Sequence, residues 1–183
     1  MTEKNETVVD LLRAQHEEIR RLFTIVEGNT GAVRHDAFDR LRHLLAVHET
    51  AEEEVVHSFA RRELSDGDKV VDARLEEENQ AKGTLAELER LGPDAHEFDA
   101  LFAQFRKDVE EHAAHEEREE FPQIAKKATE QQLRGMAAAV KAAEAVAPTH
   151  PHQGTESVAK NLLAGPAAAV VDRARDAIAK VRG

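Results

Sequence analysis

The chain has 183 residues, of which 33% are charged and 4% are aromatic, and it contains no cysteine, tryptophan or tyrosine. Its formal net charge of −11 argues against binding to nucleic-acid phosphates or to an anionic membrane surface, because both require clustered lysine and arginine. The missing cysteine and tyrosine exclude disulfides, thiolate metal sites and tyrosyl-radical chemistry, so any metal must be bound through nitrogen and oxygen.

The first 127 residues are predicted to form four helices. Their apolar residues recur at spacings of three and four, which places them on one face of each helix, and segments with glycine or proline separate them. Thr7 and Asp10 form a capping pair before the first helix, and Phe121-Pro122 is expected to end or kink the fourth. The predicted helices cover residues 7–27, 36–64, 69–91 and 95–121.

Residues 128–183 are predicted to form an extension that packs on the bundle. An alanine-rich helix is expected at about 129–146 on the bundle exterior, and the prolines that follow it require a loop or wrapping arm. His150 and His152 in this arm are interpreted as a polar turn, with a lid as the alternative. A short amphipathic helix after Pro166 is expected to dock on the bundle or to pair between subunits, so monomer and dimer both stay open.

Polar residues interrupt the apolar stripes at matching positions in the two halves of the chain. A His-x-x-x-Glu pair occurs in the second and fourth helices, and its two members stack on one helix face. The first and third helices each carry one polar residue at a core position. The repeat predicts an all-α, up-down-up-down four-helix bundle with a C-terminal helical extension. The six interruptions are His16, His48, Glu52, Glu78, His112 and Glu116.

These six side chains are the predicted metal ligands. Three carboxylates buried together would repel one another, and no lysine or arginine is expected on the stripes, so a bound cation is the natural source of positive charge. Three imidazoles and three carboxylates exceed the needs of one tetrahedral zinc, and carboxylate oxygens suit ferric iron. The donor set therefore favours a non-haem di-iron centre, with manganese, zinc or a mixed pair as alternatives.

Other ionisable residues near the motifs are assigned weaker roles. His115 lies one step off the apolar stripe, so it is expected behind the ligands or at the opening to solvent. His115 and Glu117 are the candidates for proton relay. His57 is expected to line the same end of the bundle. Glu49 and Glu53 are expected to point outward or to lie behind the ligands, and the remainder of the acidic run 116–120 is interpreted as a solvated face.

This pattern resembles the hemerythrin-like, or HHE cation-binding, family over residues 7–127. The resemblance implies a four-helix bundle that holds two oxo- or hydroxo-bridged iron ions, with Glu52 and Glu116 as bridging or capping carboxylates. The family usually has histidine where this chain has Glu78, and an extra anionic ligand favours ferric iron, which argues against reversible oxygen carriage. The residues that carry the resemblance are His16, His48, Glu52, His112, Glu116, Glu117 and Phe121-Pro122.

The sequence therefore favours a di-iron protein that decomposes hydrogen peroxide, like a catalase or peroxidase, or performs related oxidant or iron redox chemistry. A carrier or sensor of O₂, NO or iron without turnover is the alternative, and a metal-free interaction module is the third hypothesis. No apolar run approaches the ~20 residues that span a bilayer, and the polar N-terminus does not resemble an export signal. A cytoplasmic protein is expected.

Overall fold

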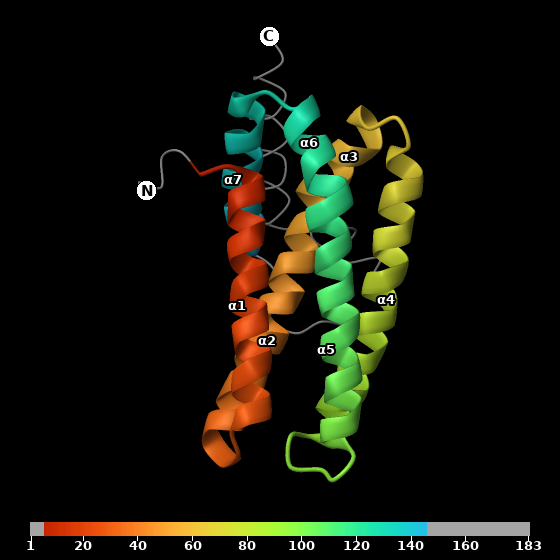
Figure 1. The fold of residues 1–183 in the computed structure, drawn as a ribbon. Coiled ribbons are helices and arrows are strands. Elements are labelled where there is room, and N and C mark those ends of the chain that lie inside the picture. The colour runs from red at the N-terminus through yellow and green to blue at the C-terminus, as the bar shows by residue number, and fades with distance from the viewer. Residues whose placement is uncertain (1–5, 146–183) are drawn as a thin grey trace, which may run out of the picture.

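Residues 6–145 are described by the computed structural model, and within this range the chain forms helices and no strands (Figure 1). Two of the long helices contain a π-helical segment, labelled η2 and η3, that is continuous with its α-helical neighbours. The elements are α1 (Val8–Gly28), α2 (Gly31–Ala51), η2 (Glu52–His57), α3 (Ser58–Glu63), α4 (Gly67–Leu91), α5 (Phe98–His115), η3 (Glu116–Glu120), α6 (Phe121–Lys127) and α7 (Glu130–Glu144).

Four antiparallel rods form the bundle, as predicted. They are α1, the continuous α2–η2–α3, α4, and the continuous α5–η3–α6, and each runs opposite to the rod before it (Figure 1). Thr7 and Asp10 form the predicted capping box at the start of α1. No helix within residues 6–145 is both long and apolar enough to cross a membrane.

Two helices begin at residues other than those predicted. The second rod starts at Gly31 instead of Asp36, because Gly31 adopts a positive φ of 58° that lets the chain reverse within two residues. The fourth rod starts at Phe98 instead of Ala95, after a turn that begins at Gly92, whose φ is 78°.

The Phe121-Pro122 sequence does not end the fourth rod. The helix continues to Lys127, and the π-helical segment η3 directly precedes Pro122. Proline lacks the backbone N–H that an α-helix requires at that position, and a wider turn is one way to accommodate its ring. The second rod contains a similar wide turn, η2, which begins at Glu52, the glutamate of its His-x-x-x-Glu pair.

Two apolar clusters divide the core along the bundle axis. One fills the half near the α1–α2 and α4–α5 connections, where phenylalanines from three rods meet, including Phe23, Phe38 and Phe102. The other fills the opposite half, where α7 packs against α1, α2 and η2. Between the two clusters lies a layer of buried histidine and glutamate side chains.

Helix α7 packs against α1, α2 and η2 from outside the four rods, and its buried face belongs to this second cluster. Met136 and Val140 are fully buried against the bundle. Thr129 caps the helix and forms a reciprocal pair with Gln132. The histidines of the predicted arm, His150 and His152, and the helix expected after Pro166 lie outside the described residues.

Replacing Gly67 with alanine is expected to lower the unfolding free energy by about 2 kcal/mol. A Cβ atom at Gly67 would collide with the carbonyl oxygen of Ala60 and lie 2.8 Å from the Cα atom of Arg61, both of which are backbone atoms. Gly135, in α7, is the matched control, because a Cβ atom there meets nothing within 4 Å. Gly135→Ala should stabilise the protein by up to about 1 kcal/mol. Equal denaturation midpoints for the two variants would contradict this account.

Candidate metal centre

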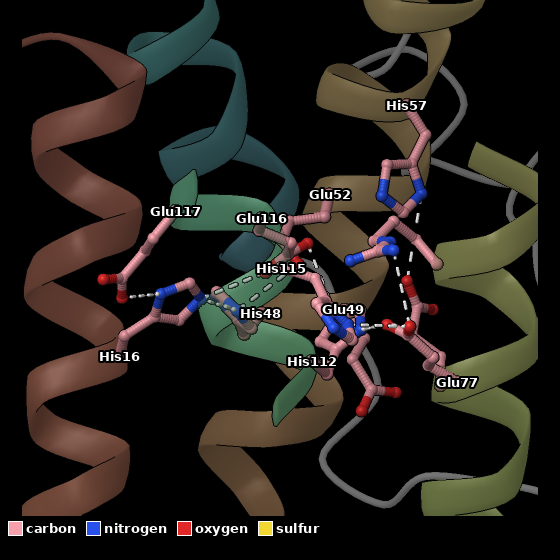
Figure 2. Close-up of polar contacts among 12 residues, drawn as sticks. His16, His48, Glu49, Glu52, His57, Glu77, His112, His115, Glu116 and Glu117 are labelled. Carbon is pink, nitrogen blue, oxygen red and sulfur yellow. Dashed lines mark hydrogen bonds and ion pairs between the residues drawn. The ribbon is translucent and has the colours of Figure 1, made fainter. Parts of the chain in front are cut away.

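Four of the six predicted ligands converge in the polar layer between the two apolar clusters. One donor atom from each of His16, His48, Glu52 and Glu116 lies within 4.8 Å of the other three. The two histidines come from α1 and α2, and the two glutamates are the first residues of η2 and η3 (Figure 2). All four side chains are buried, with residue exposures between 0% and 3%.

The spacing of these donor atoms fits a single ion. The Nε2 atoms of His16 and His48 are 3.2 Å apart. His16 Nε2 lies 3.3 Å from Glu116 Oε2, and His48 Nε2 lies 3.3 Å from Glu52 Oε2. Donors bound about 2.1 Å from a common metal, at neighbouring coordination positions, are separated by about 3.0–3.4 Å.

Hydrogen bonds on the outer side of each ring fix which nitrogen faces the cluster. His16 Nδ1 is 2.8 Å from Glu117 Oε1, and His48 Nδ1 is 2.7 Å from Gln15 Oε1 (Figure 2). Both partners are acceptors, so each neutral ring carries its proton on Nδ1 and presents an Nε2 lone pair to the cluster. The amide of Gln15 donates to Glu144 of α7, which keeps the Gln15 oxygen turned toward His48.

The cluster contains buried carboxylate oxygens that have no hydrogen-bond partner. Burial lowers the pKa of His48 to about 3, and nearby His16 adds to this effect, so the His48 ring is neutral near pH 7. Burial also raises the pKa of Glu52 well above its ordinary value, as does the neighbouring carboxylate of Glu116. Neither oxygen of Glu52 has a hydrogen-bond partner. Buried acceptors without partners are costly, and a cation would satisfy all of them at once.

His112 borders the cluster through Glu116. Its Nε2 atom lies 3.4 Å from Glu116 Oε1, and its Nδ1 atom lies 3.0 Å from Glu77 Oε2. The other oxygen of Glu77 is 2.9 Å from Nδ1 of His115, whose side chain is 36% exposed. Burial opposes protonation of His112, but the Glu116 carboxylate outweighs it and raises the pKa of His112 well above its ordinary value.

Glu78 lies in the same layer, but a lysine compensates its charge. Glu78 is 1% exposed, its Oε2 atom lies 3.4 Å from the ammonium group of Lys82, and its Oε1 atom lies 3.9 Å from His57 Nδ1. The expectation that no cation lies on the stripes is therefore wrong. Lys82 and the buried Arg74 are each four residues from Glu78, so all three share one face of α4.

The acidic run 116–120 is only partly a solvated face, because Arg118 and Glu119 are exposed but Glu120 is buried. Glu120 is 1% exposed, and neither of its carboxylate oxygens has a hydrogen-bond partner. The signal was present in the sequence, because His112, Glu116 and Glu120 continue one spacing of four along the same helix face. His57 is buried at the same end of the bundle, and Glu49, expected outside or behind the ligands, is 9% exposed and pairs with Lys82. The roles of Gln15, Glu77 and Glu144 escaped sequence reasoning because they depend on contacts between helices.

A small pocket, open in part to solvent, adjoins the polar layer. Most of its floor is apolar, so it suits a small uncharged molecule better than an ionic substrate. The pocket reaches both imidazoles of the cluster and His112. It is lined by His16, Ile19, Arg20, Leu45, His48, Glu49, Glu78, Ala81, Val109, Glu110, His112 and Ala113.

Comparison with known proteins identifies this arrangement. The family model described as "Hemerythrin HHE cation binding domain" matches residues 7–124. The chain belongs to this family. A crystal structure of a hemerythrin HHE cation binding domain-containing protein from Mycobacterium kansasii has the same fold, with a TM-score of 0.65 and 21% identity, over 92% of this chain and 99% of that one. No curated protein sequence matches the chain.

Membership in the hemerythrin HHE family and the histidine–glutamate cluster together indicate metal binding, typically of iron. The donors at the first cluster are two imidazoles and two carboxylates, a set that suits iron, manganese or zinc. At the predicted ligand positions, the two halves of the chain differ only once. Helix α4 carries Glu78 where α1 carries His16.

Glu117→Ala is expected to weaken iron binding by about 10–100-fold, because the hydrogen bond to Nδ1 fixes the His16 ring and makes its Nε2 atom a better donor. Glu117 also accepts a hydrogen bond from Arg20, at 2.8 Å, which holds its carboxylate in place. Glu119, two residues on and 59% exposed, provides the matched control Glu119→Ala. Competition against a chromophoric chelator measures both affinities, and equal values for the two variants would contradict the orienting role.

Proposed function

We propose that the protein is a non-haem di-iron protein that decomposes hydrogen peroxide, with His16, His48, Glu52 and Glu116 as ligands and His112 beside them. One observation carries the metal assignment. Two imidazole lone pairs and two carboxylates converge within 4.8 Å, and Glu52 has no other partner for either of its oxygens. A pair of iron ions, one of them held by this cluster, would take up electrons from one peroxide molecule and pass them to another.

The pocket supports a small neutral substrate. Hydrogen peroxide is uncharged near neutral pH and is little larger than water, which suits a small pocket with mostly apolar walls. Disproportionation turns two molecules of peroxide into two of water and one of O₂, so the reaction needs no other oxidant or reductant. As ligands, the carboxylates of Glu52 and Glu116 would each bring a negative charge to the iron, which favours the ferric state over a stable ferrous carrier.

The hydrogen-bonded series His112–Glu77–His115 supports proton movement between the site and solvent. Glu77 contacts both rings, at 3.0 and 2.9 Å, and the outer ring is partly exposed. Each peroxide O–O cleavage consumes protons, and each peroxide oxidation releases them. In this proposal His115 exchanges protons with water, and Glu77 passes them to His112.

The test is peroxide consumption by the iron-loaded full chain, followed by O₂ release. Glu52→Ala and Glu116→Ala should each abolish turnover above the level of free iron, because each removes a carboxylate of the cluster. Glu119→Ala serves as the control for loss of a nearby exposed carboxylate and should keep full activity. Undiminished turnover in both cluster variants would contradict the proposal, and so would a spectral response to O₂ or NO with no peroxide consumption.

A further inference from the structure

A second group of metal-binding side chains lies beside the first, and the HHE motif residues do not account for it. Donor atoms from His57, Glu116 and Glu120 all lie within 4.8 Å of one another. His57 is the last residue of η2, and Glu116 and Glu120 are the first and last residues of η3. The group therefore comes from the two facing π-helical segments.

Within residues 6–145, nothing forms a hydrogen bond with the side chains of two members of this group, His57 and Glu120. His57 is 3% exposed and Glu120 is 1% exposed. Neither ring nitrogen of His57 and neither carboxylate oxygen of Glu120 has a hydrogen-bond partner. A buried imidazole normally donates from one nitrogen and accepts at the other, so two such residues side by side without partners call for an explanation.

Arg74 and Lys82, which lie on the same face of α4 as Glu78, form their ion pairs with carboxylates outside this group. Arg74 forms its ion pairs with Glu77, at 3.4 Å, and Glu119, at 3.8 Å. Lys82 pairs with Glu49, Glu53 and Glu78, and its ammonium group lies 2.9 Å from Glu53. Neither cation contacts Glu120 within ion-pair distance.

The π-helical turn η2 explains how His57 reaches the layer, whereas Glu120 lies on the same helix face as Glu116, four residues earlier. A wide turn adds a residue to the helix repeat, so His57, five residues after Glu52, joins the inward face that an α-helix would give to residues 55 and 56. In the other rod, η3 begins at Glu116 and ends at Glu120, which is also turned inward. π-helical turns are rare in proteins, and they occur most often at functional sites. Here two of them lie at equivalent places in facing rods.

We propose that His57, Glu116 and Glu120 form the second metal position of the centre, and that Glu116 is shared between the two positions. This inference rests on the proposed metal centre and specifies its second half. Glu78 then serves as the ion-pair partner of Lys82 and is not required as a ligand. The two positions together supply three carboxylates and three neutral imidazoles. The three negative charges of the carboxylates nearly balance the four positive charges of two divalent ions.

Metal stoichiometry of the full chain tests the proposal. After anaerobic loading with ferrous iron and desalting, elemental analysis should find two iron ions per wild-type chain, and one in His57→Ala and in Glu120→Gln. Glu119→Gln and Glu78→Gln should keep two. After air oxidation, the one-ion variants should give the EPR signal of isolated ferric ions, whereas a coupled pair in the wild type is EPR-silent.

The outcomes separate this inference from the proposed function. If wild-type protein holds two irons and consumes peroxide but His57→Ala and Glu120→Gln also hold two, only the second position is wrong. Loss of one iron in Glu78→Gln, with two kept in Glu120→Gln, would assign the position to Glu78 and overturn the proposal. Wild-type protein that binds no iron overturns both. Circular dichroism confirms folding, and the near-isosteric Glu120→Gln tests the position even where His57→Ala does not fold.

Discussion

Glu52→Gln is expected to raise the thermal stability of the metal-free protein and to lower that of the iron-loaded protein. The Glu52 carboxyl is fully buried, and burial together with Glu116 raises its pKa well above the ordinary 4.5. The unfolded chain is ionised at this position at pH 7, whereas folding disfavours the charged form, and this difference opposes folding. Glutamine has the same shape and no such cost.

With iron the sign reverses, because glutamine replaces a charged ligand by a neutral one. A ligand present at 100 times its dissociation constant stabilises the fold by about 2.7 kcal/mol, and the variant forfeits much of that. Thermal unfolding of wild type, Glu52→Gln and the exposed control Glu119→Gln, each with iron and with chelator, measures both effects. A loss of stability in the variant under both conditions would show that Glu52 serves the fold and not a metal.

The sequence was sufficient for the bundle because each rod repeats one simple pattern. Apolar spacing, the Thr7 cap and the glycine-containing breaks specify four helices, and short connections make neighbouring rods antiparallel. The same pattern located His16, His48, Glu52 and Glu116, since a polar residue on an apolar stripe must find a partner inside the bundle. The structure brings these four together.

The pattern failed where helix geometry changes. A prediction based on 3.6 residues per turn cannot place side chains beyond a π-helical turn, and both η2 and η3 begin at the glutamate of a His-x-x-x-Glu pair. His57 is the last residue of η2, so the spacing does not place it on the inward face. Glu120 keeps the spacing of four from His112 and Glu116, and the acidic residues around it are what favour a solvated face there. Pro122 marked the site of the distortion, although the sequence did not say whether the helix would end, kink or widen.

Contacts between rods are the other limit. The orientation of the His48 ring depends on Gln15 from α1, which in turn depends on Glu144 from α7. The ammonium group of Lys82 reaches Glu49 and Glu53 on the second rod. Such pairings need the relative rotation of two helices to within a fraction of a turn, and the spacing of apolar residues within one helix does not determine that rotation.

The metal-free protein should lose stability as the pH rises from about 6.5 to 8. Burial and the Glu116 carboxylate raise the pKa of Glu120 to about 8, so the folded chain keeps a proton there that the unfolded chain, with a carboxyl pKa of 4.5, has lost. Stability falls with pH wherever the folded state binds more protons, and the fall is complete only above the folded-state pKa. Glu120 alone contributes a loss of about 2 kcal/mol over this window.

Other groups in the layer act in the same direction. Burial raises the pKa of Glu52, and Glu116 raises the pKa of His112 despite burial, so each group binds its proton more tightly in the folded chain than in the unfolded one. His48 and His57, whose pKa values burial lowers to about 3 and 4, have the opposite effect, but only below pH 6.5, where unfolded histidine is charged.

Urea denaturation in the presence of a chelator at pH 6.5, 7.2 and 8 measures this loss. Glu120→Gln should reduce the loss by about 2 kcal/mol, and Glu119→Gln should leave it unchanged. Iron-loaded protein should show the reverse dependence, because metal and protons compete for the same carboxylates and imidazoles, so that loading strengthens as the pH rises. The gap in stability between loaded and metal-free protein therefore widens toward pH 8. Metal-free stability that stays constant or rises across the window would mean that the layer holds its carboxylates ionised by some other cation.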